Sequence, residues 1–447
     1  MKILNKMPWL SNRRRLLILV IIDYLIINLI FISLQSYEII NTNFIAVNIL
    51  SLCWILMSYI QDKYSIVEDE YNYNFINNFL RTLRICIFTG IIFKLFIIIS
   101  TFFKSNVGDG KWIIFLITIS LVSYIYEILH TFIIKKYISK PMLWISIYSN
   151  SNLGTLFTEP NVLEKYGYYK SLDIRNLNEY IGIDSSKFGF ILEDINLLKS
   201  EEKKILINFK NEGFKILSIV NWLERYVHRY PTEFISSTKI LSELLTYSQS
   251  NTSRRIKRFS EFSISLFLIF IFSPIIIIAA IFIKIEDNGP ILYSQIRNGF
   301  GGKIFRIYKL RSMSINAERK GIQWSTYNDP RITKIGYWLR KTRIDELPQL
   351  FSVINGDMSL IGPRPERPEI DEILTKEIPN YKLRYLVRPG LSGWAQVNYP
   401  YGASLADSNN KLGYDLFYIC NYSLHLDLLI LFKTMRTVFS GKGSIPN

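Results

Sequence analysis

Two adjacent carboxylates, Asp345 and Glu346, are the residues of this chain whose type and spacing most directly suggest chemistry. Pro348 follows two residues later. Proline is tolerated in a helix only in its first turn, so we expect the pair near a helix N-terminus. The helix dipole there favours ionised carboxylates, as do three cations just upstream: Arg340, Lys341 and Arg343. An ionised aspartate can act as a nucleophile, and its neighbour can ligate a metal ion. The alternative is that the two acids only complement a helix start.

Two further cations stand in patterns that suit phosphate binding. Lys309 lies in the segment Lys303–Arg311, where cations alternate with apolar residues. Such a stretch at a membrane surface would meet lipid phosphates or an anionic substrate, although interfacial anchoring explains most of its cations equally well. Arg364 lies between Pro363 and Pro365, which hold it in a rigid extended backbone suited to bidentate phosphate binding. The alternative for Arg364 is a surface ion pair.

The last part of the chain reads as a second rigid turn followed by helices. The turn begins at Arg388-Pro389-Gly390 and leads into a predicted strand. The segments Tyr414–Tyr418 and Leu424–Phe439 predict helices that pack beside the site or lie on the membrane. Asp415 in the first of them could contact substrate, but an ion pair inside the protein explains it more simply.

Composition and charge point to a membrane rather than to nucleic acid. Of 447 residues, 49% are hydrophobic, and the formal net charge is +16. The cations flank apolar runs, as membrane anchoring requires. The cysteines and histidines are scattered, which predicts neither a disulfide framework nor a zinc site, so a metal would be a hard cation held by oxygen ligands. These scattered residues are Cys53, Cys86, Cys420, His130, His228 and His425.

Four apolar runs in the first third of the chain are long enough to span a bilayer. They cover about residues 16–34, 44–60, 85–103 and 112–134, and the first lacks the pattern of a cleavable signal. Clusters of Lys and Arg lie before the first run, between the second and third, and after the fourth, so both ends of this unit are predicted to be cytoplasmic. Asp23 and Glu127 lie within runs. Such acids can mark a transport path, but helix packing accounts for two isolated acids more simply.

The middle of the chain, residues 138–250, predicts a small α/β domain. Leu143–Ile147, Gly189–Leu192 and Ile205–Ile207 are expected to be strands alternating with polar helices. The turn after the first strand, Tyr148–Gly154, contains one glycine, which does not support a nucleotide-phosphate loop. We interpret the domain as a scaffold or regulatory module.

A basic linker, Asn251–Arg258, is predicted to precede a fifth apolar run at about residues 261–285. Ser273-Pro274 interrupts this run. The proline removes a backbone hydrogen bond, and the serine hydroxyl can satisfy a freed carbonyl. Cations follow the run, which is typical of a cytoplasmic flank. We therefore expect a bent, re-entrant helix that enters one leaflet and returns; the alternative is a fifth span with a proline kink.

Four ordered blocks of the C-terminal half closely resemble the bacterial polyprenyl-phosphate glycosyl-1-phosphate transferases. The blocks are Lys309–Met313, Arg343–Leu350, Gly356–Pro365 and Gly390–Gln396, and the resemblance covers about Arg254 to the C-terminus. It implies a membrane protein of mixed α and α/β class. The parts would be a four-helix transmembrane region (1–137), a degenerate Rossmann-like domain (138–250) and a mainly helical monotopic catalytic domain (251–447). The first two parts rest on architecture alone.

The resemblance also implies a reaction and its residues. A UDP-sugar would give its sugar-1-phosphate to undecaprenyl phosphate, releasing UMP, as the first membrane step of exopolysaccharide, capsule, O-antigen or glycan synthesis. Asp345 matches the nucleophile that forms an aspartyl-phosphosugar, and Glu346 the acid expected to ligate Mg²⁺. The residues matching phosphate-binding or substrate-orienting groups are Lys309, Arg340, Arg364 and Gln396. Many relatives have Ser where this chain has Arg343, which alters the local field but leaves the acid pair intact.

The setting implied is the bacterial inner membrane, with both termini and the active site cytoplasmic. Expected partners are the UDP-sugar, undecaprenyl phosphate and membrane lipids, without nucleic acid, and the resemblance leaves room for a homodimer. The alternative function is a non-catalytic scaffold or regulator of a polysaccharide assembly complex. A glycosidase is disfavoured because adjacent helical residues do not face each other across a sugar. The sequence does not indicate the sugar, the glycan pathway or the ligand of the middle domain.

Overall fold

The computed structural model describes residues 14–36, 44–61, 63–64, 75–102, 112–137, 143–148, 168–173, 185, 187–192, 198–232, 251–315, 317, 329–400, 402 and 404–440. These residues divide into two compact units, Met1–Trp222 and Leu223–Asn447. Each unit is described by itself below.

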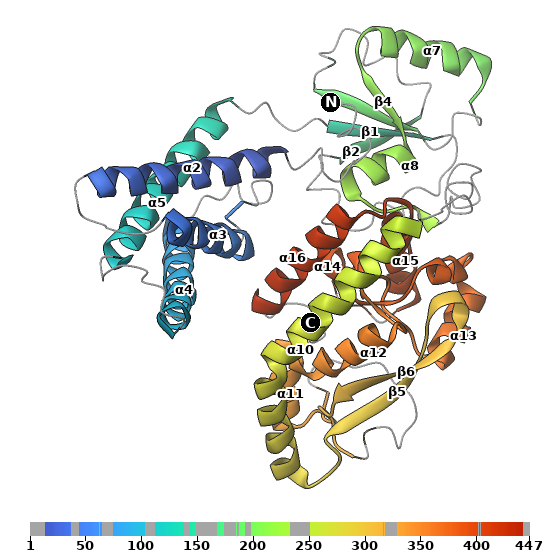
Figure 1. The fold of residues 1–447 in the computed structure, drawn as a ribbon. Coiled ribbons are helices and arrows are strands. Elements are labelled where there is room, and N and C mark those ends of the chain that lie inside the picture. Colours follow the sequence, from blue (N-terminus) through green and yellow to red (C-terminus); the bar gives the residue numbers. More distant parts are fainter. Residues whose placement is uncertain are drawn as a thin grey trace. The chain divides into compact units, whose positions relative to one another are not determined.

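The first unit begins with four long apolar helices (Figure 1). They are α2 (Arg14–Ser36), α3 (Phe44–Ile60), α4 (Phe75–Phe102) and α5 (Trp112–Tyr137). Each of the four predicted apolar runs therefore lies in a helix. Among the described residues, Ile18–Ser36 and Trp112–Leu129 are long and apolar enough to cross a membrane, and α3 is a shorter apolar helix. The chain is thus a membrane protein with several candidate spans.

Both acids within these helices have basic partners. Asp23 Oδ2 accepts a hydrogen bond from Lys63 Nζ at 2.5 Å, and the same ammonium donates to Ser123 Oγ at 2.6 Å. Glu127 forms an ion pair with Arg81. The first pair joins α2 to the turn just after α3, and the second joins α4 to α5. Both therefore act as the packing groups that the sequence favoured over a transport path.

A four-stranded parallel sheet follows these helices in the first unit, in the order β2-β1-β3-β4. The strands are β1 (Leu143–Tyr148), β2 (Tyr168–Asp173), β3 (Phe188–Leu192) and β4 (Lys215–Ser218). The first two predicted strands are confirmed, and this strand order is found in doubly wound α/β folds. The turn at Tyr148–Gly154 lies, apart from Tyr148, outside the described residues.

The third predicted strand, Ile205–Ile207, is wrong because these residues lie in helix α7 (Ser200–Asn211). Leu206 and Phe209, three residues apart, point into the core with Phe190 of β3, while Ile207 is exposed. A spacing of three is helical, and the three consecutive apolar residues concealed it. The helix is followed by β4 and the short helix α8 (Ile219–Trp222).

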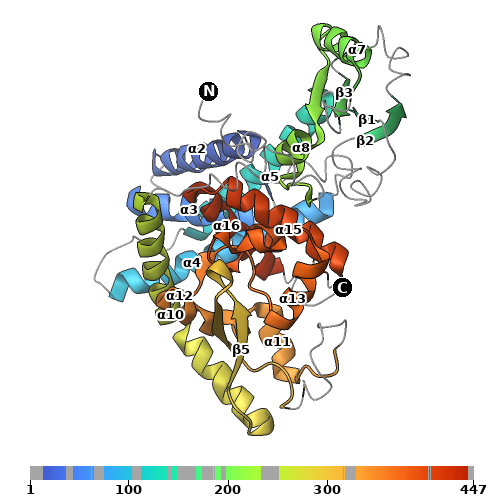
Figure 2. The same cartoon turned by 90° about the vertical axis from the view of Figure 1, so that its right-hand side faces the viewer.

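The second unit contains the long helix α10 (Asn251–Asp287), which continues through Pro274. Ser273 Oγ donates to Phe270 O at 2.8 Å, as the sequence suggested. The axis changes direction along its length (Figures 1 and 2). Thr252–Asp287 is the third described segment long and apolar enough to cross a membrane. Whether it re-enters one leaflet stays a prediction.

The predicted linker Asn251–Arg258 is wrong, since these residues form the first turns of α10. Their cations bind protein carbonyls: Arg258 Nη2 donates to Ile354 O at 2.5 Å, and Lys257 Nζ donates to Ile361 O at 3.1 Å. Glu261, one turn later, accepts hydrogen bonds from Ser359 and from the Leu360 N–H. The base of α10 is therefore fastened to the segment that leads to Arg364.

The remaining elements of the second unit are short and mainly helical, as predicted. The strands are β5 (Leu292–Asn298), β6 (Ile304–Leu310), β7 (Ser359–Ile361) and β8 (Gly390–Ser392), where β5 and β6 form an antiparallel hairpin and β7 and β8 a parallel pair. The α-helices are α11 (Lys334–Thr342), α12 (Leu350–Asn355), α13 (Pro368–Glu377), α14 (Trp394–Asn398), α15 (Leu405–Cys420) and α16 (Leu424–Ser440). Tight 3-10 turns are η7 (Phe300–Gly302), η8 (Ile344–Gln349) and η9 (Tyr381–Leu386), and η5 (Leu223–Val227) is a wider π-helical turn.

Candidate active site

The acid pair lies in the first turn of η8, close to where the sequence predicted a helix start. Helix α11 ends at Arg343, whose φ of 60° turns the chain sharply before η8 begins. A left-handed conformation is unfavourable for a side chain with a Cβ, so the surrounding packing must hold it. Pro348 is accommodated in η8, and α12 follows directly. The turn thus presents Asp345 and Glu346 between two helices.

Glu346 is held by cations from three different segments. Its Oε1 atom accepts hydrogen bonds from Lys309 Nζ at 2.9 Å and from Arg364 Nη2 at 2.7 Å. Arg343 Nη1 lies 3.5 Å from Oε2. Burial alone would raise the pKa of the Glu346 carboxyl, but the charges of Arg364, Lys309 and Arg343 outweigh it and hold the pKa well below its usual range. Glu346 is therefore ionised and oriented.

Asp345 has the opposite environment. Its side chain is buried, and Oδ1 has no hydrogen-bond partner within the described part of the chain. Burial, together with the negative charge of Glu346, raises the pKa of Asp345 to about 6, against the opposing effect of Lys309, Arg340 and Arg343. At neutral pH this carboxylate is mostly ionised yet poorly solvated. An ionised, unsatisfied oxygen in a cationic site is well suited to nucleophilic attack.

Lys309 comes from the hairpin, where alternation along β6 decides which side chains face inward. Ile307 is buried and Tyr308 is exposed, so Lys309, two residues after Ile307, lies on the inward face. Burial lowers the pKa of the Lys309 ammonium, and the charges of Glu346 and Asp345 oppose that effect. The residue that the sequence singled out is thus directed to the acid pair rather than to lipid.

Arg364 stands on a turn made from both predicted rigid turns, which lie side by side. Strands β7 and β8 pair in parallel, and Gly362 N donates to Ser392 O at 2.9 Å. The backbones approach so closely that a Cβ on Gly390 would lie 2.1 Å from Gly362 N. Glycine at both positions is therefore a packing requirement. The predicted strand after Arg388 exists, but it is short and gives way to helix α14.

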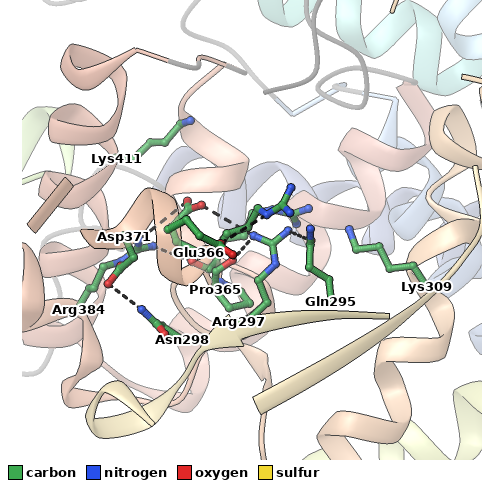
Figure 3. A network of polar contacts seen from close by, with 12 residues as sticks. Gln295, Arg297, Asn298, Lys309, Pro365, Glu366, Asp371, Arg384 and Lys411 are labelled. Atoms are coloured by element: carbon green, nitrogen blue, oxygen red, sulfur yellow. Dashed lines mark hydrogen bonds and ion pairs between the residues drawn. The ribbon is translucent and has the colours of Figure 1, made fainter. Parts of the chain in front are cut away.

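A network of polar side chains that the sequence did not reveal contacts the turn that carries Arg364, and Figure 3 shows this network. Arg297 of β5 and Arg384 of η9 each lie 4.0 Å from a carboxylate oxygen of Glu366. Asn298 Nδ2 donates to Asp371 Oδ2 at 2.8 Å. None of these residues lies in a segment whose spacing suggests chemistry. In the sequence, the one indication of this network was the presence of charged residues in strands and turns whose neighbours are apolar.

The other predicted site residues are placed less directly. Arg340 of α11 is close enough to Asp345 for its charge to lower that residue's pKa. Gln396 of α14 lies beside Gly393, and its Oε1 is buried without a hydrogen-bond partner among the described residues. Asp415 forms the expected ion pair, accepting from Arg384 Nη2 at 3.0 Å. Ser273 and Pro274 lie in α10, as described above.

Hard-cation ligands are few in this site. Within the described residues, no group of three or more His, Cys, Asp or Glu side chains is arranged to hold a metal ion. Asp345 and Glu346 are two carboxylates, one with an open oxygen and the other firmly ionised. Mg²⁺ is commonly held by one or two carboxylates together with substrate phosphates and water. The acid pair fits that pattern, and it does not fit a cage built from protein alone.

Residues 252–441 match the model of a family described as bacterial sugar transferase. A Bacillus subtilis protein, provisionally named an undecaprenyl-phosphate N-acetylgalactosaminyl 1-phosphate transferase, is 51% identical over 129 residues, which are 29% of this chain and 72% of that protein. The chain belongs to the bacterial sugar transferase family.

Two longer relatives are similar over the same region. The UDP-N-acetylgalactosamine-undecaprenyl-phosphate N-acetylgalactosaminephosphotransferase of Aeromonas hydrophila is 48% identical over 189 residues, or 42% of this chain and 45% of the relative. The UDP-glucose:undecaprenyl-phosphate glucose-1-phosphate transferase of Escherichia coli K12 is 36% identical over 197 residues, or 44% of this chain and 42% of the relative. The chain thus spans less than half the length of these two relatives.

Proposed function

We propose that this protein transfers a sugar-1-phosphate from a UDP-sugar to undecaprenyl phosphate, giving undecaprenyl-diphosphate-sugar and UMP. The observation that carries the proposal is the contrast within the acid pair: Asp345 has an open, buried oxygen, whereas Glu346 is fixed by Lys309 and Arg364. Family membership supports the reaction class, and the names of the relatives support a UDP-sugar donor and an undecaprenyl-phosphate acceptor. This reaction would be the first membrane step of polysaccharide synthesis.

The first half-reaction forms a covalent intermediate on Asp345. A carboxylate oxygen attacks the sugar-linked phosphorus, and the bond from that phosphorus to the bridging oxygen of the diphosphate breaks. UMP leaves with the bridging oxygen and its electron pair, so the charges balance without an added proton. Lys309, Arg364 and Arg343 all contact Glu346, the neighbour of Asp345. In this proposal their charges stabilise the negative charge that moves to the leaving phosphate.

The second half-reaction regenerates the enzyme. A phosphate oxygen of undecaprenyl phosphate attacks the phosphorus of the aspartyl-phosphosugar, and the bond from phosphorus to Asp345 breaks. The carboxylate returns to its ionised form, and the lipid carries the new diphosphate. Dividing the transfer into two steps lets two anionic substrates use one cationic site in turn, which avoids holding both phosphates beside each other.

We propose Mg²⁺ as the cofactor. Glu346 would hold it, with Asp345 adjacent and the donor diphosphate and water completing the coordination. The ion would neutralise the diphosphate and polarise the bridging phosphate oxygen. Since the described residues provide no larger set of carboxylates, the cation in this proposal arrives with the donor. Arg364 would then exchange its contact with Glu346 for the phosphates.

We further propose that the protein resides in the bacterial inner membrane, with its termini and active site on the cytoplasmic side. The cations that follow α10, including Arg297 and Lys309, support a cytoplasmic flank. Helix α10 would then be re-entrant, placing the acid pair at the interface where a soluble donor meets a lipid phosphate. A homodimer and a regulatory role for the parallel-sheet domain are compatible with this arrangement.

The test is UMP release by purified membranes with Mg²⁺ and undecaprenyl phosphate. The donor panel contains UDP-N-acetylgalactosamine and UDP-glucose, the donors named for the relatives, with other UDP-sugars beside them. We expect release with one donor, and its loss in Asp345→Asn, which removes the nucleophile and keeps the side-chain shape. Full activity in Asp345→Asn would refute the covalent mechanism. No release with any donor would favour the scaffold alternative.

A further inference from the structure

The turn that carries Arg364 is held by hydrogen bonds from outside it. Pro363 and Pro365 have no N–H groups, so the turn has few donors of its own. Instead, the carbonyls of four consecutive residues each accept a hydrogen bond from another part of the unit. The donors are Gly390 N to Pro363 O at 2.8 Å, Arg384 Nη2 to Arg364 O at 2.8 Å, Arg297 Nη1 to Pro365 O at 3.1 Å, and Asn298 N to Glu366 O at 3.0 Å.

Two of these four donors are guanidinium groups, and other side chains fix both of them. Arg384 also donates to Asp415 at 3.0 Å, and both side chains are buried. Arg297 Nη2 donates to Gln295 Oε1 at 2.5 Å. Glu366 lies between the two guanidiniums. Its Oε2 atom is 4.0 Å from Arg297 Nη1, and its Oε1 atom is 4.0 Å from Arg384 Nη1. Burial lowers the pKa of Arg297 only to about 10, whereas, despite burial, Tyr381 and Asp415 hold the pKa of Arg384 above its ordinary value, so both guanidiniums are charged at neutral pH. Figure 3 shows this arrangement.

We propose that Arg297 and Arg384 are positioning residues for Arg364. By holding the carbonyls of Arg364 and Pro365 from two sides, they fix where the Arg364 side chain begins. Its guanidinium then stays within reach of Glu346 in the free enzyme and of the donor phosphates during the reaction. We call the hydrogen bonds from Arg384 to the Arg364 carbonyl and from Arg297 to the Pro365 carbonyl the clamp. The clamp is a feature of the fold, whereas its role in catalysis rests on the proposed function.

Direct contact of the two positioning residues with substrate is disfavoured by their existing bonds. The Arg384 side chain is only 7% exposed and serves Asp415 and the Arg364 carbonyl. The Arg297 guanidinium is turned toward Pro365, Gln295 and Glu366. In contrast, the Arg364 side chain is 37% exposed and contacts the Glu346 carboxylate. Of the three arginine side chains, that of Arg364 is therefore the most accessible to a substrate.

The first test is a double-mutant cycle between Arg297 and Arg364, measured as kcat/KM for UMP release. Arg297→Gln removes the charged guanidinium. Arg297→Lys keeps the positive charge but cannot donate to Pro365 O and Gln295 Oε1 with the planar geometry of a guanidinium. In the normal Arg364 background we expect kcat/KM to fall about 10- to 100-fold, since small displacements of a charge-stabilising group have effects of this size. In the Arg364→Ala background the further loss should be below about threefold. If Arg297→Gln lowers kcat/KM by the same factor in the normal and the Arg364→Ala backgrounds, the two residues act independently and the proposal is overturned.

A matched control comes from the same hairpin. Arg306 of β6 is exposed and points to the opposite face, where it makes one long hydrogen bond to Ser294 at 3.4 Å. Arg306→Gln removes the same charge from the same hairpin without touching the turn. It should leave kcat/KM within about twofold, because a surface charge so weakly engaged contributes little. A loss equal to that of Arg297→Gln would mean that hairpin charge, and not positioning, is responsible.

The second test does not depend on activity. Amide hydrogen exchange is measured on the peptide covering residues 361–367 in the full-length protein and in Arg297→Lys. We expect faster exchange in this peptide, with exchange in α15 unchanged, because the clamp is lost locally and the fold is kept. Unchanged exchange would overturn the proposal even if activity fell. If no donor gives UMP release in the unsubstituted protein, the proposed function fails, and the exchange result still decides whether the clamp exists.

Discussion

The pH dependence of UMP release follows from the environment of Asp345. Attack requires the ionised carboxylate, whose pKa is raised from the ordinary 3.8 to about 6 by burial and by the charge of Glu346. A group with a pKa near 6 is about nine-tenths ionised at pH 7 and about one-tenth ionised at pH 5. Activity should therefore be lost as pH falls through about 6, with about a tenfold decrease between pH 7 and pH 5.

The acidic limb of the pH–rate profile is the range in which activity falls as Asp345 is protonated. Substitutions of the neighbouring charges should move this limb in opposite directions. Two unit charges about 6 Å apart interact by about 3 kcal/mol at an effective dielectric constant of about 20, or about two pH units. Glu346→Gln removes a negative neighbour, so the limb should move toward lower pH by about one to two units. Lys309→Met removes a positive neighbour and should move the limb toward higher pH. Both variants will be slower, but the position of the limb is independent of the maximum rate.

The assay is kcat/KM for UMP release between pH 4.5 and 8.5 at constant ionic strength. This ratio reports the ionisation of the free enzyme, which in our proposal has not yet received its cation. Samples held at pH 5 and returned to pH 7.5 must recover full activity, which separates titration from unfolding. A flat profile down to pH 4.5, or the same limb position in both charge variants, would refute the assignment of Asp345 as the titrating nucleophile.

Three further outcomes are expected. Incubation with donor alone should add the mass of a sugar phosphate to the protein, and Asp345→Asn should prevent this addition in intact-mass measurements. Removing divalent cations with a chelator should stop UMP release, and Mg²⁺ should restore it; unchanged release would remove the metal from the mechanism. Gly390→Ala should lower the free energy of unfolding, measured by denaturation in detergent, by about 1–3 kcal/mol. The reason is that the added methyl group would lie 2.1 Å from Gly362 N.

The acid pair was predictable from sequence because its signals are local. Pro348 limited the helix position, and the upstream cations marked the electrostatics of the turn. The long apolar helices were also predictable from sequence, because the length and composition of an apolar run are enough to predict a helix that can span a membrane. What escaped prediction was the start of α10, where polar residues at Asn251–Arg258 continue the helix and bind carbonyls of α12 and β7.

The clamp on Arg364 could not be predicted because its members are remote in sequence and ordinary in type. Arg297 precedes Pro365 by 68 residues, and Arg384 follows Arg364 by 20 residues. Each is a single arginine in a strand or a tight turn, where a solvated surface charge is the usual explanation. Only the pairing of β7 with β8 and the placement of the hairpin bring these segments to one turn.

Asp345 and Glu346 differ in chemistry because of residues outside their motif. As adjacent carboxylates they have similar ordinary pKa values, yet one is raised and the other lowered. The difference arises because Lys309 from the hairpin and Arg364 from the turn both reach Glu346 Oε1, while Asp345 Oδ1 receives no hydrogen bond within the described residues. The motif therefore supplies two equivalent acids. Two distant cations anchor Glu346 and leave Asp345, the nucleophile in our proposal, with an oxygen that has no hydrogen bond within the described residues. For this reason we expect the reaction to be more sensitive to the geometry of Arg364 than to its charge alone.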